Sequence, residues 1–295
     1  MKTKNLEGLA FLILAAMIWG LALVAQKAGT ENLGPLTFTG IRCTLGSLSM
    51  IPLIVILDRR KTAEQKKAEH NPAVLLKGSV ICGLVVFSFT ILQQTGIQYT
   101  TVGKAGFITA LYIILVPLGG LFLRRKVEKK IWLAVLIALI GFYLMCMSGG
   151  LNEINKGDIM MLLASFGCAA HIYVIDFYVN KIDAVKFSSL QFLVTGIICL
   201  VLAVFMEEIR MEDIAATAIP ILYAGIGSCG LGYTFQILGQ KYVEPAKASL
   251  ALSSETIFTM LAGMIFFHEL LSTREYAGCG LIFFAIILSQ IERKS

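Results

Sequence analysis

QQTGIQYTTVGKA (93–105) and QILGQKYVEPAKA (236–248) are two versions of one passage. Self-similarity at a fixed offset, here 143 residues, indicates an internal duplication. Five positions are identical, with Gln93, Gly96, Tyr99, Lys104 and Ala105 matching Gln236, Gly239, Tyr242, Lys247 and Ala248. The fold is therefore expected to contain one structural unit twice.

The chain around both passages is strongly apolar. Its 295 residues are 57% hydrophobic and 15% charged, with a mean hydropathy of +0.79, which is too apolar for a soluble protein of this size. The apolar residues form ten runs, each near the roughly 20 residues with which an α-helix crosses a bilayer. We predict an all-α integral membrane protein with ten transmembrane helices, at 6–26, 35–57, 75–97, 102–123, 131–148, 158–179, 187–206, 216–239, 246–267 and 275–291. The first run is long for a signal peptide, so we expect an uncleaved helix.

Lysine and arginine are unequally distributed over the predicted loops. Of the 25, nineteen lie at the termini and in the even-numbered loops, five lie in the odd-numbered loops, and Arg42 lies inside a span. The positive-inside rule then predicts a multi-pass protein of the cell membrane with both termini in the cytoplasm. The net charge of +6 is a topology signal and gives no reason to expect nucleic-acid binding.

The duplication predicts two five-helix units, 1–150 and 151–295, that meet in the polar loop SGGLNEINKG near 148–157. Their N-terminal parts align weakly at an offset near 149, where Gly8 meets Gly157 and Phe38 meets Phe187. Because five is odd, the second unit would enter the membrane from the opposite side. Inverted repeats of this kind are typical of secondary transporters.

Several segments are expected to deviate from regular helix. Pro52 and Pro117 lie inside predicted spans, where proline kinks a helix. The glycine-rich stretch GIGSCGLG (225–232) indicates either close helix packing or a hinge. The charged segment 58–74 is predicted to be a solvated linker.

Ionisable residues inside the spans are the first candidates for function, because each costs about 2.5–3.5 kcal/mol in hydrocarbon. Arg42 could line a cavity or extend its charge to the interface. Glu255 could serve a cavity, a substrate or a proton, or belong to a buried pair. His171 could line a cavity or be a packed core residue, and Asp176 is expected at the surface.

Amide and aromatic side chains supply further candidates. Gln93 and Gln236 occupy equivalent positions in the repeated passage, and could line a cavity or hydrogen-bond helices together. The same alternatives apply to the other candidates, with helix–helix bonding favoured: Gln26, Gln94, Tyr112, Tyr173 and Gln191.

Motifs of soluble enzymes and metal centres are missing. The sequence has no GxSxG, HExxH, P-loop or GxGxxG motif, and its seven cysteines lie in predicted helices without a CxxC pair. We therefore expect no metal, no cofactor and no enzymatic activity. The alternative is a membrane-embedded enzyme acting on a lipid or lipid-linked substrate, with His171, Glu255 or Asp176 as acid and base.

Three stretches resemble the EamA type of the drug/metabolite transporter superfamily. AAMIWGLALVAQK (15–27) resembles its opening signature, with Trp19 in the Trp-Gly pair, and GPLTFTGIR (34–42) resembles its second-helix signature. The stretch 246–272 resembles the end of the second repeat, where the family has Leu-Glu-Pro and a Gly-Glu-x-Leu-like element. This chain has Ser254-Glu255-Thr256 and His268-Glu269-Leu270, so a proline-linked kink is not expected.

The resemblance implies two five-helix repeats around a central cavity, with the fifth and tenth helices at the periphery. Family members move amino acids, other small metabolites or drugs by alternating access, commonly as exporters and without ATP hydrolysis. The implied partners are a small-molecule substrate, the lipid bilayer and a coupling proton at Glu255. The candidate cavity residues are Trp19, Gln26, Arg42, Gln93, Tyr112, His171, Gln236 and Glu255.

Overall fold

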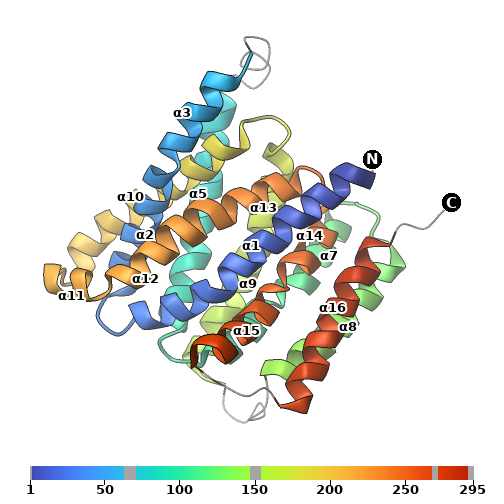
Figure 1. Ribbon diagram of the computed structural model, residues 1–295. Helices are drawn as coiled ribbons and strands as arrows, with labels where there is room; N and C mark the ends of the chain where they lie inside the picture. Colours follow the sequence, from blue (N-terminus) through green and yellow to red (C-terminus); the bar gives the residue numbers. More distant parts are fainter. Residues whose placement is uncertain (1, 63–70, 147–153, 268–271, 292–295) are drawn as a thin grey trace.

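The computed structural model describes residues 2–62, 71–146, 154–267 and 272–291, and within these ranges it is helical and without strands (Figure 1). The helices are α1 (Lys2–Gly29), α2 (Pro35–Ser49), α3 (Ile51–Arg60), α5 (Pro72–Gly96), α6 (Val102–Thr109), α7 (Tyr112–Phe122), α8 (Lys129–Cys146), α9 (Lys156–Tyr178), α10 (Ala184–Met206), α11 (Met211–Ala216), α12 (Ala218–Leu222), the π-helix η1 (Tyr223–Gly232), α13 (Tyr233–Gln240), α14 (Pro245–Leu252), α15 (Glu255–Phe267) and α16 (Thr273–Gln290). Parts of the predicted linker 58–74 and of the repeat boundary 148–157, and all of His268-Glu269-Leu270, lie outside the described residues.

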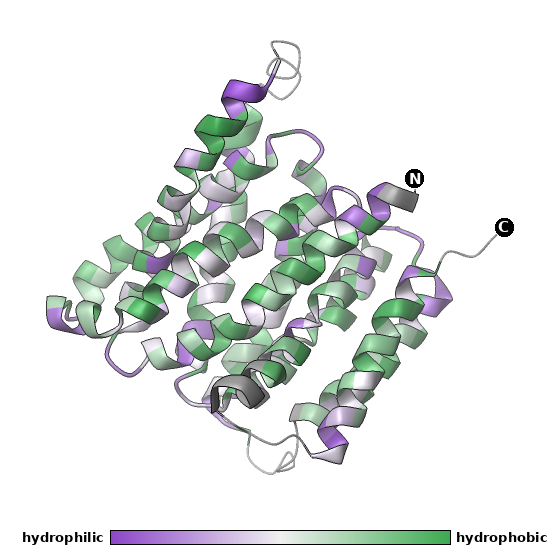
Figure 2. Ribbon diagram, viewed as in Figure 1, coloured by the Kyte–Doolittle hydropathy of each residue, from purple (hydrophilic) through white to green (hydrophobic). Residues whose placement is uncertain are grey.

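Every predicted span coincides with a helical stretch. Seven stretches of the described chain are long and apolar enough to cross a bilayer: 4–29, 35–60, 72–96, 104–122, 156–178, 184–206 and 218–240. The other three predicted spans are helical as α8, α14 with α15, and α16, and their crossing of the membrane stays a prediction. Apolar residues predominate along the helices of the bundle (Figure 2). The chain is thus a multi-pass membrane protein.

The spans that contain Pro52 and Pro117 are both interrupted. In the first, α2 ends at Ser49 and α3 begins at Ile51, with Pro52 in its first turn. In the second, α7 runs through Pro117 and the interruption lies earlier, at Ala110–Leu111. A proline ring meets the carbonyl four residues earlier, so the break at Met50 lies within reach of Pro52. The break at Ala110–Leu111 lies beyond the reach of Pro117, which therefore does not explain it.

A third interruption lies in the predicted span 246–267, which contains no proline. The segment breaks at Ser253–Ser254, between α14 and α15. The hydroxyl of Ser253 donates to Leu250 O and that of Ser254 to Ala251 O, each at 2.7 Å. Serine side chains compete with the helical backbone for its carbonyls, which explains a break without proline.

Two of these interruptions fall at matching positions of the repeated passage. Shifted by 143 residues, α6 (Val102–Thr109) coincides with α14 (Pro245–Leu252). The same shift brings Tyr112, the first residue of α7, onto Glu255, the first residue of α15. Both passages therefore enter a helix that breaks after eight residues.

Contacts between helices also come in matching sets. Helix α9 packs against α5, α6 and α7, and α1 packs against η1, α13, α14 and α15. Helices α2 and α10 pack against each other in the bundle, and α8 and α16 form a separate pair at its edge (Figure 1).

The glycine-rich stretch forms the π-helix η1 and packs closely on α2. A Cβ atom added to Gly46 would lie 2.5 Å from Cys229 Cβ and 2.7 Å from Gly225 O. A Cβ on Gly225 would lie 3.0 Å from Arg42 O. The close-packing alternative for this stretch is thus observed. The π-helical geometry, which is frequent at functional sites, keeps the hinge alternative open.

Candidate functional site

One polar pocket lies between helices of both halves of the chain. Its volume is about 60 Å³, enough for several water molecules. It is lined by all eight candidate residues, Trp19, Gln26, Arg42, Gln93, Tyr112, His171, Gln236 and Glu255. Nine further residues complete the lining: Ala22, Leu23, Phe89, Thr109, Cys168, Ile172, Ser228, Tyr233 and Leu252.

Most of the lining consists of repeat-equivalent pairs. At the offset of 149, three positions of α1 correspond to three of α9: Trp19 to Cys168, Ala22 to His171, and Leu23 to Ile172. At the offset of 143, three further pairs line the pocket: Gln93 with Gln236, Thr109 with Leu252, and Tyr112 with Glu255. The two halves of the chain thus contribute the same positions with different side chains, which makes the pocket chemically asymmetric.

Arg42 supplies a buried positive charge. Arg42 lies on α2, and the close contact between α2 and η1 fixes the position of that helix. The side chain of Arg42 is 3% exposed. Its guanidinium lies 5.6 Å from the ring centroid of Phe38, and its Nε and Nη2 atoms have no hydrogen-bond acceptor. Because the side chain lines the pocket, the structure does not support the alternative in which its charge reaches the interface.

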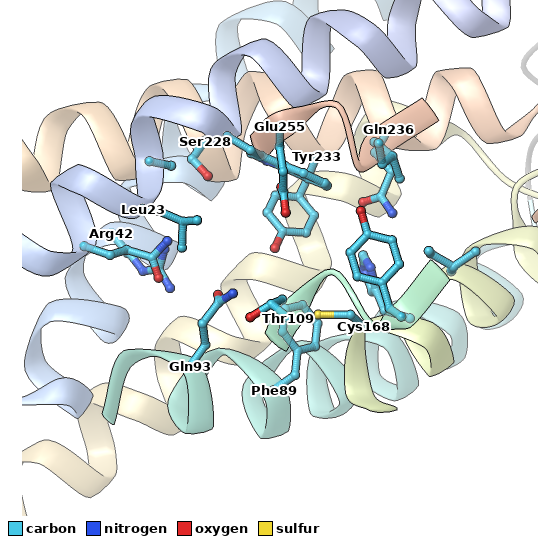
Figure 3. A pocket seen from close by; sticks show the side chains of 17 residues that line it. Leu23, Arg42, Phe89, Gln93, Thr109, Cys168, Ser228, Tyr233, Gln236 and Glu255 are labelled. Carbon is cyan, nitrogen blue, oxygen red and sulfur yellow. The ribbon is translucent and has the colours of Figure 1, made fainter. Parts of the chain in front are cut away.

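Glu255 supplies a buried negative charge at the start of α15. Its side chain is 8% exposed, and it makes no hydrogen bond or ion pair with the described residues. The dipole at a helix N-terminus favours a carboxylate at this position. Close contact with α1 positions it, since a Cβ on Gly20 would lie 2.9 Å from Glu255 O, and Thr259 Oγ1 donates to Gly20 O at 2.9 Å. Figure 3 shows Arg42 and Glu255 reaching the pocket from separate helices.

Aromatic rings form one wall around His171. Its ring centroid lies 5.6 Å from that of Phe89 and 5.6 Å from that of Tyr233, and Trp19 packs on Tyr233 at 4.5 Å. His171 Nε2 lies 3.1 Å from Gln191 Oε1. His171 is therefore both a packed, hydrogen-bonded core residue and part of the lining. A wall of this kind suits an apolar or cationic portion of a solute.

The amides separate into two groups. Gln94 Nε2 donates to Gln26 O at 3.0 Å, and Gln191 accepts from Cys82 Sγ at 2.9 Å, so Gln94 and Gln191 connect helices as expected. Gln236 Nε2 donates to Gln240 Oε1 at 3.0 Å. The other polar atom of this side chain, Gln236 Oε1, receives no hydrogen bond. Gln236 thus combines a bond within its helix with a free acceptor at the pocket.

Several buried polar atoms at the pocket have no partner. They are Trp19 Nε1, Gln26 Oε1, Tyr112 Oη and Gln236 Oε1, in addition to the two nitrogens of Arg42. Buried polar groups are normally hydrogen-bonded, and an exception calls for an explanation. A polar solute or water in the pocket would supply these missing bonds.

The remaining candidates lie outside the pocket. Tyr173 points elsewhere and donates to Val116 O at 2.5 Å. Asp176 pairs with Arg125 at 2.6 Å near the surface, as expected. His171 and Glu255 both line the pocket, whereas Asp176 lies outside it, so the three groups considered for acid–base catalysis do not meet at one place. Among the described residues, no three His, Cys, Asp or Glu side chains are placed to hold a metal ion.

Two parts of the lining were missed by sequence reasoning for different reasons. Cys168 and Ala22 could have been found by applying the offset of 149 to the candidates Trp19 and His171, whereas Leu23, Ile172, Thr109 and Leu252 are equivalent only to one another. Phe89, Ser228 and Tyr233 carry no such signal. Ser228 lies in η1 and Tyr233 directly follows it, and a π-helix changes which side chains share a face.

The family model of the EamA-like transporters matches the chain twice, over residues 6–147 and 155–290. The chain belongs to this family. The opening and second-helix signatures that suggested it contribute Trp19 and Arg42 to the pocket. Membership accounts for the apolar helices and for the absence of a soluble domain in the matched ranges.

Individual proteins show the same relationship. An uncharacterized transporter of Archaeoglobus fulgidus is 26% identical over 278 residues, which cover 94% of this chain and 83% of that protein. The uncharacterized transporter YoaV of Bacillus subtilis is 25% identical over 288 residues, covering 94% of each chain. A protein of known crystal structure shares the fold with a TM-score of 0.77 at 15% identity, over 98% of this chain and 97% of that one.

Proposed function

We propose that the protein is a secondary-active carrier, which exports small polar metabolites by alternating access around the central pocket. The observation that carries this proposal is the pair of unpartnered, buried, opposite charges, Arg42 and Glu255, on one pocket that both halves of the chain build. Family membership and the transporter names of the relatives support it.

The two charges define the solutes that the pocket suits. Each buried charge costs about 2.5–3.5 kcal/mol inside a membrane, and a bound solute of complementary charge offsets that cost. Arg42 fits an anionic group and Glu255 a cationic one, beside the rings of Trp19 and Tyr233. Amino acids and drug-like amines are the solute classes with these features. Since the pocket holds only about 60 Å³, binding requires its walls to move apart.

Glu255 is also the group that we propose to carry the coupling proton. It faces the pocket from the start of α15, next to the break at Ser253–Ser254. A proton and a cationic solute would compete for the single negative charge of this carboxyl group. Binding of one therefore requires release of the other, which couples proton movement to solute movement.

The matched segments 6–147 and 155–290 support two inverted five-helix units, 1–150 and 151–295, with ten crossings and both termini in the cytoplasm. The coinciding breaks of α6–α7 and α14–α15 and the matching contacts of α1 and α9 support the same organisation. In Figure 1, the start of α1, the end of α3 and the end of α16 lie toward one side of the bundle, and α11 lies toward the other.

Opposite orientation of the two units predicts that the two copies of the repeated passage lie on opposite sides of the membrane. A cysteine at Tyr99 should react with an impermeant thiol reagent only from outside the cell, and a cysteine at Tyr242 only from inside. Labelling in sealed right-side-out and inside-out vesicles measures both. Reaction of both cysteines from the same face would rule out the inverted arrangement.

The proposed function is tested by transport with purified protein in proteoliposomes. Efflux and uptake of radiolabelled amino acids and small amines should show at least one solute that moves faster than in protein-free liposomes. If folded protein moves none of a broad panel, the proposal is wrong.

A further inference from the structure

The two turns of the repeated passage are held in different ways, although their sequences match. The α5–α6 corner (residues 96–102) joins α5 to α6, and the α13–α14 corner (residues 240–245) joins α13 to α14. By the charge distribution, the first faces the outside of the cell and the second faces the cytoplasm. Their comparison shows which face this structure keeps closed.

The α5–α6 corner is tied down by charged groups from two neighbouring helices. Lys27, near the end of α1, donates its Nζ hydrogens to Ile97 O at 2.7 Å and to Thr100 O at 3.2 Å. Asp158, in the first turn of α9, accepts from Thr100 Oγ1 at 2.8 Å and pairs with Lys104 Nζ at 2.5 Å. The side chain of Asp158 is 4% exposed, so these are buried, charge-assisted bonds of the strong class.

Apolar packing at the two corners is alike. A Cβ on Gly157 would lie 2.5 Å from Gly96 O, where α9 meets the end of α5. At the other corner, a Cβ on Gly8 would lie 3.0 Å from Gly239 O, where α1 meets the end of α13. These are the same contact at the repeat offsets. The corners therefore differ in their polar contacts and share their helix packing.

The α13–α14 corner lacks the counterpart of the lysine tie. At the offset of 149, Lys27 corresponds to Asp176, whose carboxylate cannot donate to carbonyl groups and instead pairs with Arg125. The position equivalent to Asp158 is Leu9, so Lys247, which matches Lys104, has no carboxylate there.

A cavity of about 340 Å³ lies at the α13–α14 corner instead. Its walls include Glu244 and Lys247 at the corner itself. The opposite walls are formed by Gly120 in α7, Arg125 just after α7, and Tyr173 in α9. Tyr173 is the chain neighbour of Ile172, which lines the central pocket. Helix α9 thus contributes to the lining of both hollows.

The helices α2 and α10 do not share this difference between the two halves, because they have polar contacts at both repeat-equivalent positions. Glu207, at the end of α10, accepts from Leu36 N at 2.9 Å and from Thr37 N at 2.8 Å at the start of α2. Its repeat-equivalent Asp58 pairs with Lys186 at 2.7 Å at the start of α10, where Lys186 is the equivalent of Thr37.

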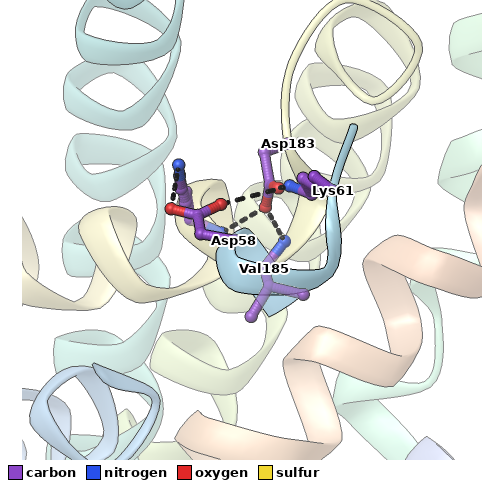
Figure 4. A network of polar contacts seen from close by, with 5 residues as sticks. Asp58, Lys61, Asp183 and Val185 are labelled. Carbon is purple, nitrogen blue, oxygen red and sulfur yellow. Dashed lines mark hydrogen bonds and ion pairs between the residues drawn. The ribbon is translucent and has the colours of Figure 1, made fainter. Parts of the chain in front are cut away.

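Asp58 also lies 3.5 Å from Lys61, which in turn pairs with Asp183, the N-cap residue of α10 (Figure 4). Polar contacts therefore hold α10 to the segment α2–α3 at both of its ends in this structure, which is expected of helices that do not move relative to each other. Of the two corners, by contrast, the α5–α6 corner has these charged contacts and the α13–α14 corner lacks their counterparts.

We propose that Lys27, Thr100, Lys104 and Asp158 form a lock that keeps the α5–α6 corner closed, and that this lock must open before the central pocket can face that side of the membrane. The inference rests on the proposed carrier function, and it adds residues that hold the entrance without touching the solute. While the lock is closed, the hollow at the α13–α14 corner is the route toward the pocket.

The test uses a chain whose only cysteine is Cys168, which lines the central pocket. Asp158→Asn keeps the size of the side chain and removes its charge. It should raise the rate at which a small, impermeant methanethiosulfonate reagent modifies Cys168 from the face of Tyr99 by about tenfold or more, because removing one partner of a buried ion pair strongly favours its separation. The matched control is Asp176→Asn, which breaks an ion pair at the other end of α9 and should not raise the rate from that face.

Charge exchange guards against a general loss of structure. The double variant Lys104→Asp with Asp158→Lys should return the rate part of the way to that of the parent chain, since it rebuilds the ion pair but not the bonds that Asp158 accepts from Thr100 Oγ1 and Asn155 N. The lock is refuted if Asp158→Asn leaves the rate from the Tyr99 face unchanged, or if Asp176→Asn raises it equally. Labelling needs no solute, so this result is independent of whether the panel contains a transported compound.

Discussion

Arg42→Gln is expected to lower transport by about 100-fold, because Arg42 is the one arginine among the described residues that line the pocket, and its loss removes the charge-assisted bonds to an anionic group of the solute. Arg42→Lys should restore part of the rate, since it keeps the charge and loses the planar fork of donors. Initial rates in proteoliposomes at equal protein density measure both effects.

Arg210→Gln provides the control for Arg42. Arg210 is exposed and, within the part of the chain that the structure describes, pairs only with Glu208, at 2.8 Å, so its loss should leave transport near the parent rate. The role of Arg42 in binding would be contradicted by an Arg42→Gln protein that is folded and transports at the parent rate. It would also be contradicted by equal losses in the Arg42 and Arg210 variants.

Glu255→Gln should abolish the response of transport to a pH gradient. Glutamine has nearly the shape of a protonated glutamate, and it can neither release a proton nor attract a cationic group. Transport driven by an imposed pH gradient should fall to the level of solute exchange alone, and exchange itself should fall about tenfold. Glu208→Gln, at an exposed carboxylate, should leave both unchanged.

Proton coupling at Glu255 fails if Glu255→Gln protein responds to the pH gradient as the parent does. A slower exchange with an intact gradient response would leave Glu255 as a solute contact only, and would place the coupling elsewhere.

The helices could be predicted because hydrocarbon leaves the backbone little choice. Apolar runs of about 20 residues must satisfy their hydrogen bonds internally, so every predicted span is helical in the structure. Interruptions were harder to place. Pro52 indicated one of them, but α7 runs through Pro117 and the break in that span lies earlier, at Ala110–Leu111. The break at Ser253–Ser254 depends on two hydroxyl bonds that no single-residue rule anticipates.

Candidate site residues could be chosen because charged and amide groups inside a membrane need a reason to be there. That argument gathered Arg42, Glu255, Gln93 and Gln236, and the structure brings them to one pocket. It could not find Tyr233, because a tyrosine in a span is unremarkable by type. Its position depends on the π-helix that precedes it.

The lock shows a further limit of sequence reasoning. The repeated passage suggested two equivalent corners, and its own residues give no sign that only one is tied. The difference lies outside the passage, where Lys27 stands at the position of Asp176 and Asp158 at that of Leu9. Only the packing of α1 and α9 against the corners reveals which side chains meet them.

Modification of Cys168 during transport tests the central claim, that solute passes through the pocket between the two broken helices. In proteoliposomes holding the chain with Cys168 as its only cysteine, modification should stop transport, and a transported solute should slow the modification. A protein that is fully modified at Cys168 and transports at its former rate would contradict the account.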